Sequence, residues 1–312
     1  MKMNQAWKKQ GINIKPGTVI TGKWHQRRYV IKRKLGNGAV GTVYLCEHNG
    51  KYAALKISEN NTSMTVEVNV LKSLQKAQAS RLGPSLLDVD DWEISRNMTY
   101  SFYVMEYLQG DSLGHFISRN GHEWVGIFML QLLEDLEYLH QSGWVFGDFK
   151  SENLIVLSQP PKIRWIDVGG TTQIGRAIKE YTEFYDRGYW GMGSRRAEPG
   201  YDLFALVMVF LHIYYPKRFE KGPNPKATLL KKLHDARPLR LYREPLKKAL
   251  LGKYQSAADM RNELLNTINR AGITGRSGKP SNRSGSGKAP LAEGSGIALV
   301  ALFYYLFSLL LP

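Results

Sequence analysis

The sequence Gly147-Asp148-Phe149-Lys150-Ser151-Glu152-Asn153 runs directly into the apolar segment Leu154-Ile155-Val156-Leu157, and Trp165-Ile166-Asp167-Val168-Gly169 follows shortly afterwards. The apolar segment predicts a strand, so the first two polar groups lie on a loop before it and Asp167 lies at a strand end. Asp148 can accept a hydroxyl proton, while Asn153 and Asp167 offer oxygen ligands of the kind that magnesium prefers. The spacing therefore indicates phosphoryl-transfer chemistry.

A glycine-rich segment lies upstream, where Gly36-Asn37-Gly38-Ala39-Val40-Gly41-Thr42-Val43 joins the predicted strands 29–35 and 41–47. Because the residues after the glycines are typical of a strand, the pattern favours a hairpin over phosphates. A dinucleotide-binding turn would instead lead into a helix. Glycines have no Cβ, so backbone amides of such a loop can approach triphosphate oxygens closely.

The next predicted strand, 52–57, carries a single lysine, Lys56, between apolar residues. Glu67 follows 11 residues later, at the start of a helical pattern of apolar residues. A buried ammonium needs a carboxylate, so we expect Lys56 to pair with Glu67. A solvated lysine on the strand surface is the alternative.

The remaining pattern predicts a further strand at 99–107 and long helices at 123–140 and 203–215, the last almost wholly apolar. With 43% hydrophobic and 22% charged residues, the composition excludes a disordered or collagen-like chain. The single cysteine, Cys46, excludes an intrachain disulfide. The sequence thus predicts an α+β protein with a small β-rich lobe followed by a larger helical lobe.

In order and spacing, these motifs resemble the bacterial Hanks-type serine/threonine protein kinases over residues 29–268. The resemblance implies a bilobal kinase domain at 29–269, with an N-lobe at 29–106 and a C-lobe at 107–269. It also implies ATP and Mg²⁺ (or Mn²⁺) as cofactors, protein substrates and autophosphorylation.

The resemblance implies a role for each matching residue. Asp148 would be the catalytic base, Lys150 would steady the transferring phosphoryl group, and Asn153 and Asp167 would hold the metal. Lys56, paired with Glu67, would contact the α- and β-phosphates, and Asp202 would brace the catalytic loop. The ATP-binding residues would be Gly36, Asn37, Gly38, Ala39, Gly41, Val43, Ala54, Lys56, Met105, Glu106, Leu108 and Ile155, with Met105 as gatekeeper.

The chain departs from the family pattern at Phe146-Gly147-Asp148, which stands where the family has His-Arg-Asp. Gly147 removes the arginine that would bind a phosphorylated activation loop, so we expect activity to be independent of such a phosphate. The candidate autophosphorylation sites in that loop are Thr171, Thr172 and Thr182. The order Ala197-Glu198-Pro199 also differs from the family's Ala-Pro-Glu.

These departures leave two other functions open. Gly-Asp in place of Arg-Asp also resembles aminoglycoside and choline phosphotransferases, which act on small molecules, although Lys150 and Ser151–Asn153 favour a protein substrate. A pseudokinase that only binds partners is the second alternative. The presence of all the expected polar residues disfavours it.

The formal net charge of +16 is concentrated in three segments. Residues 1–34 carry +10, residues 217–253 carry +9 and residues 270–296 carry +4, so the rest of the chain is mildly acidic. Basic residues interleaved with aromatic ones, as in the first segment, suit nucleic acid, so DNA is a candidate partner beside plain solvation, anionic lipid and an acidic protein substrate. The candidate DNA or anion contacts are Lys231, Lys232, Arg237, Arg240, Arg243, Lys247 and Lys248.

Two further segments flank the kinase-like region. Residues 1–28 form a basic N-terminal segment, and residues 270–296 are a basic linker rich in Gly and Ser. Residues 297–311 contain no charge and predict a single transmembrane anchor in contact with inner-membrane lipid. Basic residues precede this anchor, so the kinase domain is expected in the cytoplasm, at the cell membrane. This layout resembles the YabT-like kinases of spore-forming bacteria.

Overall fold

The computed structural model describes residues 12–38, 41–59, 61–76, 82–96 and 98–276. The chain divides into two compact units. The strand-rich unit contains the chain up to Gln109 together with Arg164–Thr171, and the helical unit contains Gly110–Ile163 and the chain from Thr172 onward. The predicted succession of a β-rich region and a helical region is confirmed.

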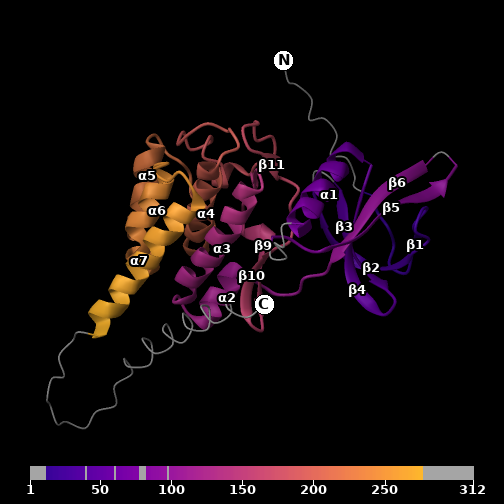
Figure 1. Ribbon diagram of the computed structural model, residues 1–312, viewed down its shortest axis with the longest axis horizontal. Coiled ribbons are helices and arrows are strands. Elements are labelled where there is room, and N and C mark those ends of the chain that lie inside the picture. The colour runs from indigo at the N-terminus through magenta and orange to yellow at the C-terminus, as the bar shows by residue number, and fades with distance from the viewer. Residues whose placement is uncertain (1–11, 39–40, 60, 77–81, 97, 277–312) are drawn as a thin grey trace, which may run out of the picture. The chain divides into compact units, whose positions relative to one another are not determined.

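The strand-rich unit is built on a six-stranded antiparallel sheet (Figure 1). Its strand order is β1-β2-β3-β4-β6-β5. The strands are β1 Val19–Thr21, β2 Arg28–Asn37, β3 Thr42–His48, β4 Lys51–Ser58, β5 Leu86–Ser95 and β6 Met98–Glu106. The predicted strands 29–35, 41–47, 52–57 and 99–107 correspond to β2, β3, β4 and β6.

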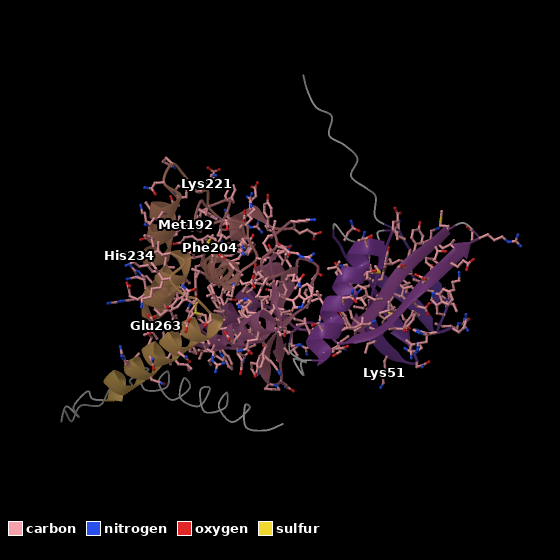
Figure 2. The ribbon with its side chains drawn as sticks, turned by 45° about the horizontal axis from the view of Figure 1, so that its top comes forward. Lys51, Met192, Phe204, Lys221, His234 and Glu263 are labelled. Atoms are coloured by element: carbon pink, nitrogen blue, oxygen red, sulfur yellow. The ribbon has the colours of Figure 1, made fainter. Side chains whose placement is uncertain are left out.

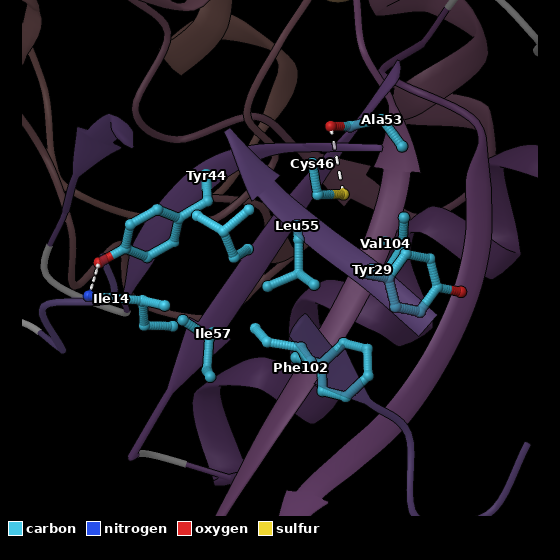
Figure 3. Packing of buried hydrophobic residues seen from close by; sticks show 11 residues of the cluster. Ile14, Tyr29, Tyr44, Cys46, Ala53, Leu55, Ile57, Phe102 and Val104 are labelled. Carbon is cyan, nitrogen blue, oxygen red and sulfur yellow. Dashed lines mark hydrogen bonds between the residues drawn. The ribbon is translucent and has the colours of Figure 1, made fainter. Parts of the chain in front are cut away.

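Alternation along these strands separates a hydrophobic core from a polar site. Leu55 and Ile57 of β4 lie in a buried cluster with residues of the neighbouring strands, including Phe102 and Tyr44 (Figure 3). Successive side chains of a strand point to opposite faces, so Lys56 lies on the other face from Leu55 and Ile57. Helix α1, Asn61–Lys76, packs against β5 and β6.

The folded unit begins earlier than the predicted domain boundary at residue 29. Strand β1 pairs with β2, and the side chains of Ile14 and Ile20 are buried in the core cluster. In the sequence, the many lysines and arginines of this upstream segment conceal its few apolar residues. Those apolar residues are nevertheless sufficient to dock it on the sheet edge.

Three cations of the basic segment 1–34 form ion pairs with acidic residues of their own unit. Lys23 lies 3.2 Å from Glu93 of β5, and Arg27 lies 3.5 Å from Asp88 of the same strand. Lys32 lies 2.7 Å from Glu47. These three cations were expected from the sequence to be available to an external anion, but each already has a carboxylate partner within the unit.

The described part of the helical unit contains six α-helices with short 3₁₀ turns and strands (Figure 1). The α-helices are α2 Leu113–Asn120, α3 Trp124–Gln141, α4 Pro199–Tyr214, α5 Pro225–Asp235, α6 Arg243–Leu250 and α7 Ala257–Arg276. The 3₁₀ helices are Ser151–Asn153, Glu183–Tyr185 and Arg237–Tyr242, and the strands are β7 Asp111–Ser112, β8 Trp144–Val145, β9 Leu154–Ser158, β10 Pro161–Trp165 and β11 Thr172–Gln173. The prediction that 203–215 is a core helix is confirmed, since α4 is buried from Tyr201 to Leu211.

Only the first residues of the predicted C-terminal segments lie within the part of the chain that the structure describes. Helix α7 continues to Arg276, so the chain is still helical at the start of the predicted linker 270–296. The rest of the linker and the predicted anchor 297–311 lie outside the described residues. Among the described residues, no helix combines the length and apolar composition needed to cross a bilayer.

Candidate functional site

The glycine-rich segment forms the connection between β2 and β3, as the hairpin prediction requires. The Thr42 hydroxyl donates to Asn37 Oδ1 at 2.6 Å, and the Gly38 amide donates to the Gly41 carbonyl at 2.9 Å. A Cβ on Gly41 would lie 2.4 Å from the Ile57 carbonyl oxygen, so a side chain cannot be accommodated there. Ala39, also expected to bind ATP, lies outside the described residues.

A charged cluster lies on the face of the sheet that carries Lys56. Its Nζ is 2.9 Å and 2.7 Å from the two carboxylate oxygens of Glu67 in α1, and 3.5 Å from Asp167 Oδ1. The Lys56 and Glu67 side chains are only 5% and 1% exposed, whereas Asp167 is 48% exposed. The Tyr103 hydroxyl donates to Glu67 Oε2 at 2.8 Å. One accessible carboxylate is therefore held beside a buried ion pair.

The electrostatics of this cluster follow from burial and charge. Burial lowers the pKa of Lys56, but the carboxylates of Asp167 and Glu67 outweigh that effect and raise it. Burial raises the pKa of Glu67, and the Lys56 ammonium only partly offsets the rise. Lys56 therefore stays charged at neutral pH and supplies a fixed positive charge for an anionic ligand.

The residues expected around adenine lie on adjacent strands of the same sheet. Ala54 of β4 pairs with Met105 of β6, and Val43 of β3 pairs with Lys56 of β4. Met105 is buried, and the Glu106 amide donates to the Ser85 carbonyl at 2.8 Å. The expected residue Leu108 follows β6 in this unit. Ile155 lies on β9 of the helical unit.

The residues expected to form the catalytic loop come together in the helical unit. Asp148 Oδ2 accepts a hydrogen bond from the Lys150 ammonium, and Asp148 Oδ1 accepts one from the Thr182 hydroxyl at 3.0 Å. The Asn153 side chain donates to the Asp148 carbonyl at 3.1 Å. The carboxylate of Asp148 thus already receives a hydroxyl donor and a cation.

Asp202 is fully buried at the start of α4 and accepts three hydrogen bonds. Its oxygens bind the amides of Phe146 and Gly147 at 2.7 Å and 3.1 Å, and His140 Nε2 at 3.0 Å. Gly147 has φ 77, a conformation that side-chain-bearing residues rarely adopt. The glycine that replaces the family's arginine thus suits the backbone here, and Asp202 holds that backbone in place.

The three candidate phosphorylation sites differ in accessibility. Thr171 is only 6% exposed, and Thr182 uses its hydroxyl to bind Asp148. Thr172 lies in the short strand β11, paired with Val145. The segment also contains its own ion pair, between Arg187 and Glu198. Burial of Thr171 and the bond of the Thr182 hydroxyl disfavour phosphorylation at these two positions.

The chemistry of the residues present matches that of a nucleoside triphosphate with a divalent metal. A Cβ on Gly36 would meet no other heavy atom within 4 Å, so the hairpin leaves room for phosphates to approach the backbone. Lys56 supplies the positive charge. Asn153 and Asp167 offer a carboxamide and a carboxylate oxygen, which are ligands for Mg²⁺ and not for soft metals.

A second polar cluster, His25, Asp88 and Asp90, is already internally satisfied. Its potential ligand atoms lie within 4.8 Å of one another. Asp88 binds His25 Nδ1 at 2.7 Å and the Tyr29 hydroxyl at 2.6 Å, and Asp90 Oδ1 accepts the Trp24 amide at 2.9 Å. These bonds fasten the N-terminal segment to β5.

The candidate DNA contacts differ in whether their charged groups already have a partner within the protein. Lys248 pairs with Glu263 of α7 (labelled in Figure 2) at 2.9 Å, and Lys247 lies 3.6 Å from Glu244. The Lys232 ammonium lies 4.7 Å from the centre of the Tyr215 ring.

Arg243 donates to the His234 carbonyl at 2.6 Å. Lys231, Arg237 and Arg240 are exposed, and none of the described acidic residues forms an ion pair with them. These three side chains remain available to an external anion.

Sequence reasoning missed three contributors to this site. Tyr103 binds Glu67, Thr182 binds Asp148, and Arg164 binds Glu106 at 2.9 Å. For Arg164, the available signal was an arginine between Ile163 and Trp165, only three residues before Asp167.

A family model described as "Protein kinase domain" matches residues 29–268. The serine/threonine-protein kinase YabT of Bacillus subtilis (strain 168) is 49% identical over 270 residues, covering 86% of this chain and 80% of that protein. Sporulation protein kinase mde3 of Schizosaccharomyces pombe is 32% identical over 148 residues, covering 43% of this chain and 26% of that protein. A crystal structure of a kinase domain is similar with a TM-score of 0.58 at 17% identity, covering 80% of this chain and 97% of that one.

Proposed function

Because this chain belongs to the protein kinase family, we propose that it transfers the γ-phosphate of ATP to serine and threonine hydroxyls of proteins, its own chain included. It is a serine/threonine protein kinase by its identity with the Bacillus subtilis relative over most of its length. The observation that carries the proposed chemistry is the bond between Asp148 and the Thr182 hydroxyl. This bond supports the proposal, because it brings a threonine hydroxyl within 3.0 Å of the carboxylate.

Each residue of the proposed site has a separate role in phosphoryl transfer. ATP with its divalent metal supplies the transferable phosphoryl group. Asp148 accepts the proton of the attacking hydroxyl, and Lys150 stabilises negative charge beside it. Lys56 binds the phosphates of the nucleotide, and Asn153 and Asp167 would hold the metal. Catalysis then comes from positioning and electrostatic stabilisation.

The test is incubation of the full-length chain with radiolabelled ATP, Mg²⁺, a generic protein substrate and, separately, aminoglycosides and choline. We expect labelled serine and threonine in protein, and none when Asp148→Asn is used. Label only in a small molecule would support the small-molecule phosphotransferase instead. Nucleotide binding without transfer to any acceptor would support a pseudokinase.

We further propose that the kinase is tethered to the inner face of the cell membrane through residues 297–311. This proposal rests on the uncharged apolar composition of that segment and on the basic residues that precede it. Fractionation of cells expressing the full chain should place it with membranes, and deletion of 297–311 should release it. Retention of the deletion variant on membranes would contradict the proposal.

We also propose that DNA binds the exposed basic residues of the helical unit and regulates the kinase. The proposal is supported by Lys231, Arg237 and Arg240, whose charges have no ion-pair partner among the described acidic residues. Exposed cations attract a phosphate backbone without reading its sequence, so the binding is expected to fall steeply with salt.

The experiment compares a triple variant, Lys231→Gln/Arg237→Gln/Arg240→Gln, with Lys248→Gln, whose charge is already paired with Glu263. In the triple variant, the slope of log affinity against log salt should fall by about 3, roughly one for each lost phosphate contact. Lys248→Gln should change it little. Equal slopes in all three proteins would contradict the interface, and kinase activity unaffected by DNA would contradict the regulation.

A further inference from the structure

Arg164 is a buried cation that the proposed chemistry does not use. Its side chain is 10% exposed, and its Nη2 donates to the Gly83 carbonyl and to Glu106 Oε2, both at 2.9 Å. The same oxygen of Glu106 also accepts the Ser85 amide at 3.2 Å. One guanidinium therefore joins three segments of the strand-rich unit: Arg164–Trp165 at the end of β10, residues 82–85 before β5, and the end of β6.

This connection reaches the metal-binding carboxylate through Gly83. Gly83 has φ 100, and a Cβ on it would lie 3.1 Å from Val168 Cγ1 and 3.5 Å from Leu71 Cδ2. Val168 follows Asp167 directly. Leu71 lies one turn after Glu67 on α1, and residues four apart share a helix face. The loop that Arg164 holds is thus packed between the neighbours of Asp167 and Glu67.

Burial makes this arrangement specific. A guanidinium removed from water requires compensation by charge and hydrogen bonds, which Glu106 and the Gly83 carbonyl provide. The Nε of Arg164 is buried and has no hydrogen-bond partner in the described structure. The position of the guanidinium is consequently set by its two acceptors.

We propose that Arg164 is a positioning residue: by joining Gly83 to Glu106, it fixes Asp167 in register with the Lys56–Glu67 pair. The inference rests on the proposed role of Asp167 as a metal ligand. Its functional consequence is that loss of the Arg164 contacts weakens the use of the divalent metal. It does not simply lower the amount of folded enzyme.

The test measures initial rates of the full-length kinase against Mg²⁺ concentration at saturating ATP. In Arg164→Met, we expect the half-maximal Mg²⁺ concentration to rise roughly 10-fold or more, as for other residues that orient metal ligands. Arg164→Lys retains the charge opposite Glu106 and should recover part of the loss. Glu106→Gln keeps an acceptor but removes the charge, so its half-maximal Mg²⁺ concentration should rise less. This variant replaces Arg164→Met in the test if Arg164→Met does not fold.

The matched control is Tyr29→Phe, which removes a buried hydrogen bond to Asp88 in the same unit. It should lower the melting temperature and leave the Mg²⁺ half-point unchanged. A wild-type half-point in Arg164→Met and Glu106→Gln would overturn the proposal and make Arg164 merely structural. Calorimetry of Mn²⁺–ATP binding gives the same comparison without turnover. A wild-type chain that binds Mn²⁺–ATP but transfers no phosphate would refute the proposed function alone.

Discussion

The buried ion pair between Lys56 and Glu67 makes the substitution Lys56→Met informative about stability as well as activity. The two side chains are 5% and 1% exposed, and Glu67 keeps its hydrogen bond from Tyr103 when the ammonium is removed. Burial already raises the pKa of Glu67 against the opposing effect of Lys56. Without Lys56, that pKa rises further, and Glu67 becomes protonated in the folded variant.

The sign of the pH dependence follows from this protonation. Glu67 binds a proton more tightly in the folded variant than in the unfolded chain, so the variant is most stable at low pH and loses stability as pH rises. Where the folded carboxyl stays protonated, each pH unit costs about 1.4 kcal/mol, or about 2.7 kcal/mol between pH 6 and pH 8. At about 2–4 °C per kcal/mol for a domain of this size, the melting temperature should fall by roughly 5–10 °C more than that of the wild type.

The assay is thermal unfolding of three full-length proteins at pH 6, 7 and 8: wild type, Lys56→Met and Lys56→Met/Glu67→Gln. The double variant keeps an acceptor for Tyr103 but has no carboxyl to titrate. It should therefore lack the additional pH dependence. If Lys56→Met follows the wild type across this range, or if the double variant shows the same additional slope, the reasoning from the buried carboxyl is refuted.

Other substitutions test the helical unit. Asp148→Asn should lower kcat by about 10²- to 10⁴-fold, the contribution of a general base, and leave ATP affinity by calorimetry unchanged; a change in affinity alone would contradict this role. Asp202→Asn weakens the bonds from the catalytic-loop amides and should cost about 2–3 kcal/mol in urea unfolding, whereas wild-type stability would refute the brace. Gly147→Ala, at φ 77, should cost about 1–2 kcal/mol in the same assay, and no loss would remove the need for glycine. Thr172→Ala should keep kinase activity in the labelled-ATP assay, and a total loss would show dependence on that hydroxyl.

Much of the fold could be predicted because its strands have the expected local patterns. Strands β2, β3 and β4 combine β-branched and aromatic residues with turn residues between them, which is sufficient to locate a meander. Strand β5 was missed because it contains Asp88, Asp90, Asp91 and Glu93, residues with low strand propensity. Their partners, among them Lys23 and Arg27, lie about sixty or more residues away, and a local pattern contains no information about that pairing.

In the candidate site too, features formed by residues close in sequence could be predicted, and contacts between distant residues could not. Asp148 and Asn153 are close in sequence, so their spacing, taken with the order of the other motifs, was enough to predict their roles. The contact of Thr182 with Asp148 spans 34 residues, and that of Arg164 with Glu106 spans 58. Contacts between residues this far apart depend on the tertiary fold of the unit, which the local periodicity and spacing of residues do not encode.

Charge shows most clearly why composition alone is a weak guide to partners. A net charge of +16 attracts anions in general, but the structure assigns many individual cations to internal tasks. Lys32 and Lys248 have carboxylate partners, and Lys232 lies over an aromatic ring. A cation that already has a close partner gains less from a phosphate, because binding must first give up that contact. The net charge therefore overstates the number of cations that lack a carboxylate partner, and among the candidate contacts of the helical unit Lys231, Arg237 and Arg240 form no ion pair with a described acidic residue.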